Sequence, residues 1–144
     1  MYVVRPASRK DRKSIKRLNF KASVEEKIWF MPNKLRFHWQ QYVVVDDDKI
    51  IGNFIITFNF NKYYDGTLAA LYLLPEHRHK GILKNVIVPY ITTHFPEYTI
   101  IVAAHRRNAV ANIVYNKLFK FYGDDKKLTW FYVTDTREGE EENV

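Results

Sequence analysis

Hydrophobic positions follow two different spacings along the chain, and the changes between them predict the order of structural elements. Short runs rich in β-branched and aromatic residues, bounded by Asp, Asn, Gly or Pro, predict strands. The predicted strands cover 2–6, 42–45, 50–60, 67–74, 98–104, 119–122 and 128–134. Hydrophobic residues three or four positions apart predict helices over 9–22, 25–39, 81–94 and 108–119.

Three features refine these elements. Residues 98–104 are apolar without alternation, which predicts a central strand covered on both faces. The segment Met31-Pro32-Asn33 interrupts the second predicted helix and divides it into two pieces. Pro89 lies inside the third predicted helix, where it predicts a kink.

The order of the elements sets the expected fold class. Strands first follow one another as hairpins and then alternate with helices, which indicates an α/β (α+β) chain. We expect a mixed, mostly antiparallel central sheet of six to seven strands with helices on both faces. The 144 residues fit one domain, expected over 1–135, followed by a disordered acidic tail over 136–144.

Composition excludes several classes of protein. The chain is 47% hydrophobic, which excludes a wholly disordered protein. It has no Cys, so disulfide scaffolds, cysteine nucleophiles and thiolate metal sites are excluded together. No apolar run reaches the roughly 18 residues of a membrane span. The start is apolar and then charged, the reverse of a secretory signal, so we expect a cytoplasmic protein.

The charge is positive and unevenly distributed. The formal net charge is +7, and four of the 16 acidic residues lie among the last seven positions. The first 21 positions hold one acidic residue, Asp11, against eight basic ones: Arg5, Arg9, Lys10, Arg12, Lys13, Lys16, Arg17 and Lys21. Such a body attracts nucleic acid, anionic lipid or a phosphorylated cofactor, and a merely solvated surface is the alternative.

The stretch 71–86 is the most informative for chemistry. A buried strand ends, a short basic loop follows, and a helix begins at Gly81. Free N–H groups at the start of a helix bind anions, and Arg78, His79 and Lys80 add positive charge at the same point. The stretch therefore predicts a phosphate or pyrophosphate site, and an ordinary strand-to-helix connection with solvated basic residues is the alternative.

The last long helix carries a second pattern. Asn108 precedes it, as a cap or as a ligand-binding group, and Asn108, Ala111 and Tyr115 share one helical face. The alternative is a capped amphipathic helix with a tyrosine in the core.

Together the two stretches resemble the GNAT superfamily, the Gcn5-related N-acetyltransferases. Arg78-His79-Lys80-Gly81-Ile82-Leu83 looks like the acetyl-CoA signature Gln/Arg-x-x-Gly-x-Gly/Ala, and the run from Leu73 to Gly81 is similar to the family's usual sequence leading into it. Asn108-x-x-Ala111-x-x-Val114-Tyr115 resembles a later motif of the family. The resemblance covers nearly the whole chain, and it implies a fold in which the fourth and fifth strands splay apart around the pantetheine arm.

The resemblance also implies roles for individual residues and direct acetyl transfer from acetyl-CoA to a primary amine. Tyr115 would be the general acid for the departing thiolate, and Asn108 would contact the cofactor arm. The main chain at Leu73 and Leu74 would pair with the pantetheine. The residues expected at the pyrophosphate are Arg78, His79, Lys80, Gly81, Ile82 and Leu83. The acceptor would be an amine-bearing small molecule or protein, and the enzyme a monomer or homodimer.

The chain departs from the family pattern at Leu83, where a Gly or Ala is usual. Leu83 would either point into the core and leave its amide free, or weaken cofactor binding. Phe119 also stands where a Gly often occurs. Leu83 and the absence of a carboxylate in the fourth strand keep open a catalytically inactive GNAT-fold binding domain, and the basic N-terminus keeps open a nucleic-acid-associated acyltransferase.

The general base is not determined by sequence. The candidates are Tyr72, Glu76, His105, and Glu25 or Glu26. His77 and His79 have no third ligand at useful spacing, so no metal is predicted. Aromatic residues that would line an acceptor pocket or pack on the sheet are Trp29, Phe30, Phe37, His38 and Trp39, with Tyr63 and Tyr64 more exposed.

Overall fold

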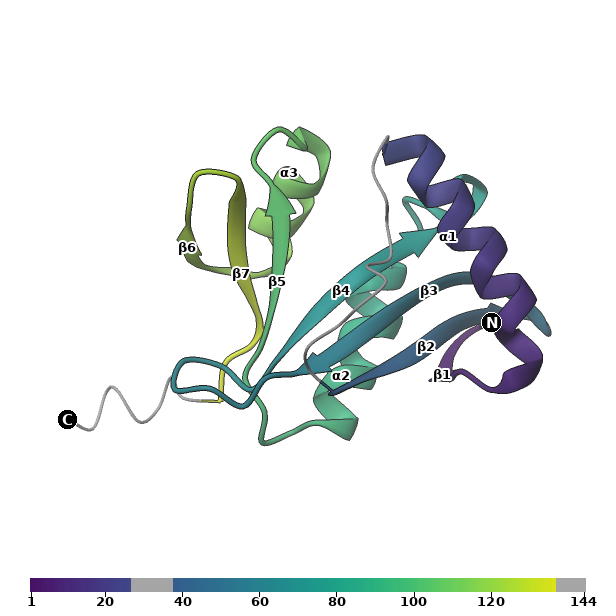
Figure 1. Cartoon of the computed structure of the whole chain (residues 1–144), viewed down its shortest axis with the longest axis horizontal. Helices are drawn as coiled ribbons and strands as arrows, with labels where there is room; N and C mark the ends of the chain where they lie inside the picture. The colour runs from purple at the N-terminus through teal and green to yellow at the C-terminus, as the bar shows by residue number, and fades with distance from the viewer. Residues whose placement is uncertain (27–37, 137–144) are drawn as a thin grey trace.

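The computed structural model describes residues 1–26 and 38–136, which form one seven-stranded sheet with helices beside it (Figure 1). The strand order is β1-β2-β3-β4-β5-β7-β6. Among the strands of the described residues, only β4 and β5 pair in parallel, and every other neighbouring pair is antiparallel. The strands are β1 (Tyr2–Pro6), β2 (His38–Asp46), β3 (Lys49–Phe58), β4 (Gly66–Leu73), β5 (Ile100–His105), β6 (Lys120–Asp124) and β7 (Leu128–Thr134). The predicted mixed, mostly antiparallel sheet is confirmed.

Helices lie on both faces of this sheet (Figure 1). Tyr42 and Phe58 on one face contact Tyr90 and Phe95 of the α2 region, while Tyr72 on the other face meets α1. α3 packs beside β5 and β7. The helical segments are η1 (Arg9–Asp11), α1 (Arg12–Glu26), η2 (Pro75–His77), η3 (Leu83–Ile87), α2 (Val88–His94) and α3 (Ala109–Leu118).

The core lies where the middle strands are covered by helices. Phe54 and Ile56 of β3 and Ile87 and Ile91 of the helix after β4 are fully buried. The predicted central strand is confirmed, because β5 lies between β4 and β7 and is buried along most of its length.

An extra residue in β4 separates its far end from β5. Ala70 and Leu71 lie opposite the single residue Phe54, and Ala70 has a left-handed backbone with φ of 51°. Such a bulge bends its strand. The parallel pairing of β4 with β5 ends at Leu68 and Val102, and beyond this point the two strands diverge (Figure 1). The splayed fourth and fifth strands expected from the resemblance are therefore present.

Two predicted helices need correction. His38 and Trp39 belong to β2, where they pair with Phe58 and Thr57, so the predicted helix over 25–39 is wrong at its end. Aromatic residues pack well on a pleated sheet, and the long hairpin with β3 decides the conformation. The middle of that predicted helix lies outside the described residues, as does most of the predicted tail.

The helix predicted over 81–94 begins with a π-helical turn, η3, before α2. Pro89 stands at the start of α2, and it has no N–H to donate to the carbonyl four residues earlier. A π-turn is one way in which a helix accommodates such an interruption.

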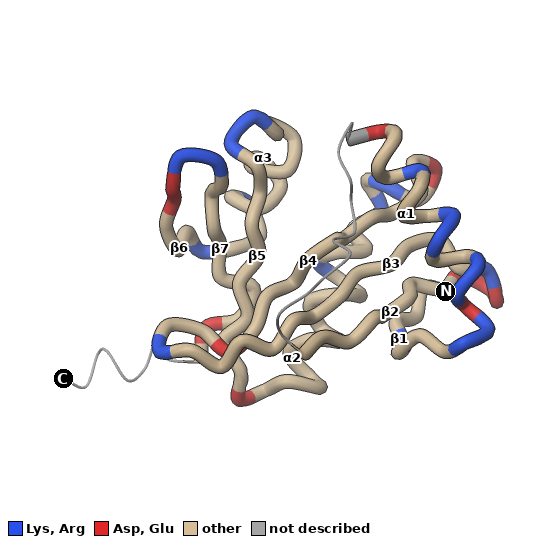
Figure 2. The backbone as a smooth tube through the Cα atoms, in the orientation of Figure 1, with Lys and Arg blue, Asp and Glu red and all other residues tan. Residues whose placement is uncertain are grey.

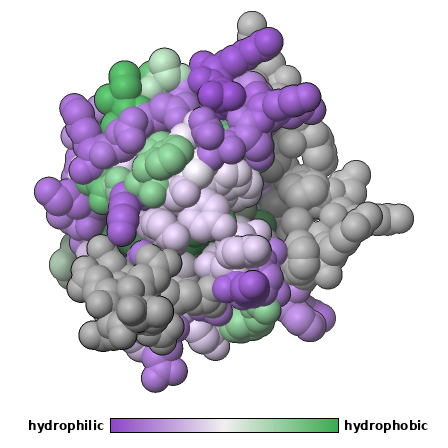
Figure 3. Space-filling model, turned by 90° about the vertical axis from the view of Figure 1, so that its left-hand side faces the viewer, coloured by the Kyte–Doolittle hydropathy of each residue, from purple (hydrophilic) through white to green (hydrophobic). Residues whose placement is uncertain are grey.

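Charged and apolar side chains are spread unevenly over the surface. Lys and Arg are concentrated along η1 and α1, with further groups at the tips of the β5–α3 and β6–β7 connections (Figure 2). At the end formed by β5–β7 and α3, separate hydrophobic areas interrupt a hydrophilic surface (Figure 3). Exposed apolar side chains of these elements are Val110, Ile113, Val114 and Phe121.

Candidate active site

The loop after β4 presents main-chain N–H groups at the point where β4 and β5 have separated. Leu74 is buried, and its N–H donates to Ile51 O at 2.9 Å, which fixes the end of the strand. His79 and Gly81 both have left-handed backbones, with φ of 62° and 72°. Among the described residues, no acceptor receives the N–H groups of residues 79–83. Unpaired amides with alternating backbone handedness form an anion-binding concavity.

Gly81 is required by this geometry. A Cβ at this position would lie 2.6 Å from Asn85 Nδ2, and the positive φ itself disfavours other residues. Leu83 is half-buried and packs against the hydrophobic core. Its side chain is therefore accommodated by the core, the first of the two alternatives that the sequence left open.

A cluster of three side chains joins α1 to the end of β4. The buried Tyr72 hydroxyl donates to Glu25 Oε2 at 3.0 Å. Arg78 Nη1 and Nη2 donate to the two oxygens of Glu25 at 2.6 and 2.9 Å, and Arg78 Nε donates to Leu73 O at 3.0 Å. The guanidinium also lies over the Tyr72 ring, 5.2 Å from its centroid. The sequence predicted Arg78 at the pyrophosphate, whereas the structure places its side chain on Glu25 and its main chain at the start of the loop.

The electrostatics of this cluster favour an ionised Glu25 and a neutral Tyr72. Hydrogen bonds from Arg78 lower the pKa of Glu25 below its usual value, against the opposing effect of burial. Burial, followed by the hydrogen bond to Glu25, raises the pKa of Tyr72 above its usual value. Tyr72 is thus better suited to hydrogen bonding than to proton abstraction.

Asn108 and Tyr115 lie on the other side of the separation between β4 and β5, at the start of α3 and within it. Asn108 caps α3 by accepting a hydrogen bond from Ala111 N at 3.1 Å, as one of the sequence alternatives expected. Tyr115 lies in the middle of α3, half-buried, with its ring 5.7 Å from those of Phe119 and Phe131. Tyr72 and Tyr115 therefore stand on different arms, one on β4 and the other on the helix beside β5.

The remaining base candidates are on the surface. Glu76 is exposed in η2, and His105 is exposed at the end of β5, where Arg107 N donates to its Nδ1 at 3.2 Å. The His77 ring is hydrogen-bonded to Tyr2, whose hydroxyl lies 2.9 Å from His77 Nδ1. Within the described segments, no three His, Asp or Glu side chains gather as metal ligands would.

Of the aromatic residues considered for an acceptor pocket, three, namely Trp29, Phe30 and Phe37, lie outside the described residues. His38 and Trp39 are exposed at the start of β2. The sequence did not reveal the Ala70 bulge or the partnership of Glu25 with Arg78, because both depend on how distant strands and helices align.

Comparisons with known proteins bear on the fold. No family model matches the chain, and no curated protein matches it by sequence. Several solved structures do match the fold of the chain. An acetyltransferase from Thermus thermophilus is 13% identical with a TM-score of 0.72, over 92% of this chain and 96% of that one. A spermidine N-acetyltransferase from Vibrio cholerae, solved with CoA and spermine, is 18% identical with a TM-score of 0.68, over 91% and 94%.

A third structure, the PaiA N-acetyltransferase of Thermoplasma acidophilum in complex with coenzyme A, is 17% identical with a TM-score of 0.65, over 92% and 98% of the two chains. The chain has the GNAT fold. β4 and β5 splay apart as expected for this fold, and the loop of residues 79–83 follows the end of β4. In the described part of this GNAT-fold chain, no helix has the length and apolar character needed to cross a membrane.

Proposed function

We propose that the protein is an N-acetyltransferase that transfers an acetyl group from acetyl-CoA to a primary amine. The observation that carries the proposal is the loop of residues 79–83, whose amides lack acceptors among the described residues, beside the divergent ends of β4 and β5. A pyrophosphate matches such a loop because its oxygens accept several hydrogen bonds from N–H groups. The GNAT fold and the neighbours solved with CoA support the same donor.

In the proposed reaction the amine attacks the thioester carbon directly. A C–N bond forms, the C–S bond breaks, and the departing thiolate takes a proton for which Tyr115 is the proposed donor. The amine loses its proton to water or to a nearby base. The chain has no Cys to carry an acyl group, so one step in a ternary complex is the simplest chemistry.

Residues on the β4 arm would position the reactants. Arg78 ties the Leu73 carbonyl to the Glu25 carboxylate, so it holds α1, the end of β4 and the start of the loop in one arrangement. We assign Arg78 and Glu25 this positioning role. The acceptor class follows from the family resemblance and from a neighbour solved with spermine, which point to an amine.

The direct test is binding followed by turnover. The protein should bind acetyl-CoA in calorimetry and release CoA thiol in the presence of one or more amines from a panel of polyamines, amino acids and peptides. Absence of binding at millimolar acetyl-CoA would contradict the proposal. Binding without turnover on any amine would favour the inactive binding domain.

The role of Tyr115 is tested by Tyr115→Phe. Removal of a general acid should lower kcat by about 10²–10⁴-fold with little change in the KM for acetyl-CoA. Tyr98→Phe, which removes the hydroxyl of a half-buried tyrosine that packs on Phe58 and Phe95, is the matched control and should keep full activity. Unchanged turnover of Tyr115→Phe would leave the acid unassigned.

A further inference from the structure

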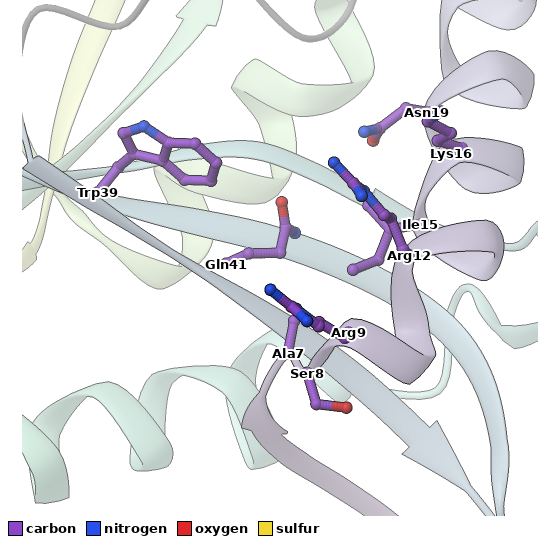
Figure 4. Close-up of a pocket in the computed structure, with 9 residues that line it drawn as sticks. All are labelled: Ala7, Ser8, Arg9, Arg12, Ile15, Lys16, Asn19, Trp39 and Gln41. Carbon is purple, nitrogen blue, oxygen red and sulfur yellow. The ribbon is translucent and has the colours of Figure 1, made fainter.

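A groove lies between the start of α1 and strand β2, and none of residues 79–83 lines it (Figure 4). Its volume is about 580 Å³, within the range of about 300–1,000 Å³ that is typical of ligand sites. The groove is lined by Ala7, Ser8, Arg9, Arg12, Ile15, Lys16, Asn19, Trp39 and Gln41. No acidic residue is among these described residues.

Three cations form the helix side of the groove. Arg9, Arg12 and Lys16 are exposed, and within the described part of the chain none of them has an ion-pair partner. Asp11, which lies between Arg9 and Arg12 in the sequence, is already paired with Arg5 at 2.7 Å. The positive charge of this wall is therefore available to an external anion.

Further Lys and Arg positions follow η1 and α1 (Figure 2). Lys10, Lys13, Arg17 and Lys21 are also exposed on η1 and α1. A row of cations this long suits a polymer with repeated negative charges better than a single small anion.

The sheet side of the groove offers an aromatic face and one oriented amide, Gln41, and α1 offers a second amide, Asn19. Trp39 is 45% exposed and lines the wall opposite the helix. Gln41 Nε2 donates to Phe54 O at 3.0 Å, which leaves the Gln41 Oε1 as an acceptor. Asn19 Oδ1 accepts from Asn53 Nδ2 at 3.1 Å, which leaves the Asn19 Nδ2 as a donor.

We propose that this groove binds single-stranded nucleic acid. Phosphates would contact Arg9, Arg12 and Lys16, and one unpaired base would stack on Trp39. The fixed donor of Asn19 and acceptor of Gln41 lie where they can meet a base edge. An acidic peptide would use the cations but not the indole face or the amides, and a duplex would have no unpaired base to stack.

Binding is measured with a fluorescein-labelled single-stranded RNA of twelve nucleotides at several salt concentrations. The variant R9Q/R12Q/K16Q should weaken binding and reduce the slope of log affinity against log salt by about 2, since each contact with a single strand contributes about 0.7. The matched control K49Q/K117Q/K126Q removes the same charge from exposed sites outside the groove and should have a smaller effect. Equal weakening by both variants would overturn the proposal, as would absence of binding by the parent protein at low salt.

Substitutions at Trp39 test stacking separately from charge. Trp39→Leu should weaken binding on the order of ten-fold, whereas Trp39→Phe should retain most of it, because both aromatic rings can stack. Folding of each variant is checked by circular dichroism. The single strand should bind more tightly than its duplex and more tightly than poly-glutamate of equal charge. If poly-glutamate competes equally well and Trp39→Leu has no effect, the groove is a site for acidic polypeptides and the proposal is wrong.

Discussion

At the scale of single residues, the proposed donor site depends on a few unusual backbone positions. Ala70 and Gly81 both have positive φ, one at the bulge that bends β4 and the other in the loop that follows it. A left-handed conformation is unfavourable for most residues, so it persists only where the surrounding structure enforces it. The bulge at Ala70 bends β4, and the loop around Gly81 leaves the N–H groups of residues 79–83 without acceptors among the described residues.

Gly81→Ala tests the loop at this scale. The added Cβ would lie 2.6 Å from Asn85 Nδ2 in a backbone that alanine disfavours, so the loop must shift. We expect the KM for acetyl-CoA to rise ten-fold or more, with a smaller change in kcat, measured by steady-state kinetics. Gly123→Ala is the matched control, because a Cβ there meets nothing within 4 Å. Equal kinetics for both variants would show that the loop does not hold the donor.

At the scale of elements, two ion pairs hold the continuous helical segment formed by η1 and α1. In η1, just before α1, Asp11 is 5% exposed and accepts hydrogen bonds from Arg5 at 2.7 and 2.9 Å and from Ser8 N at 2.7 Å. At its other end, Glu25 is held by Arg78. The first pair connects η1 to β1 and the second connects α1 to the loop after β4, so the helical segment is fixed at both ends relative to the sheet.

The pH dependence of stability tests the ion pair between Arg5 and Asp11. The hydrogen bonds from Arg5 hold the pKa of Asp11 well below its ordinary value of about 3.9. A pKa lowered by folding gives stability that is present above the unfolded value and is lost as the pH falls below about 4. Asp11→Asn should cost about 2 kcal/mol in the free energy of unfolding at pH 7 and much less at pH 3.

Urea unfolding at pH 7, 5, 4 and 3 measures this difference. Asp48→Asn, in the exposed β2–β3 turn, is the control and should follow the parent protein at every pH. If the free energies of unfolding of Asp11→Asn and the parent differ by the same amount at every pH, the loss is not due to the ionised Asp11 carboxylate, which would contradict the prediction.

At the scale of the whole molecule, the single parallel pairing divides the sheet into two arms. One arm carries Tyr72, Glu25 and the loop of residues 79–83, and the other carries Asn108 and Tyr115. The arms meet at the short parallel ladder between Gly66–Leu68 and Ile100–Val102. A donor bound between them would contact both, and its binding energy would add to the stability of the fold.

Hydrogen exchange with and without acetyl-CoA tests this two-armed binding. Protection should appear both at residues 79–83 and at the start of α3, and at a hundred times Kd the protein should gain about 2.7 kcal/mol. Acetyl-pantetheine, which lacks the pyrophosphate, should protect the loop much less at the same concentration. Protection confined to α1 and β2 would instead place acetyl-CoA in the basic groove and would contradict the proposed donor site.

Sequence and structure agree best where the determining residues are neighbours. The predicted strands are all present, because their hydrophobic spacing is local, and Asn108 caps α3 with its own side chain. The prediction failed at His38 and Trp39, where pairing with a distant strand decides the conformation. The π-turn before Pro89 was predicted only as a kink, since sequence indicates an interruption but not how the helix accommodates it.

The sequence by itself determined a single mixed sheet, a basic loop beginning at Arg78 and a positive N-terminal helix. These features follow from the spacing of hydrophobic positions, from turn residues and from charged residues, all of which are local properties of the sequence. Only the tertiary structure decided that Arg78 binds Glu25, 53 positions away, that β4 bends at Ala70, and that Trp39 faces Arg9 and Arg12 across a groove. Such contacts depend on the register of the sheet and the placement of α1, and no local pattern encodes them.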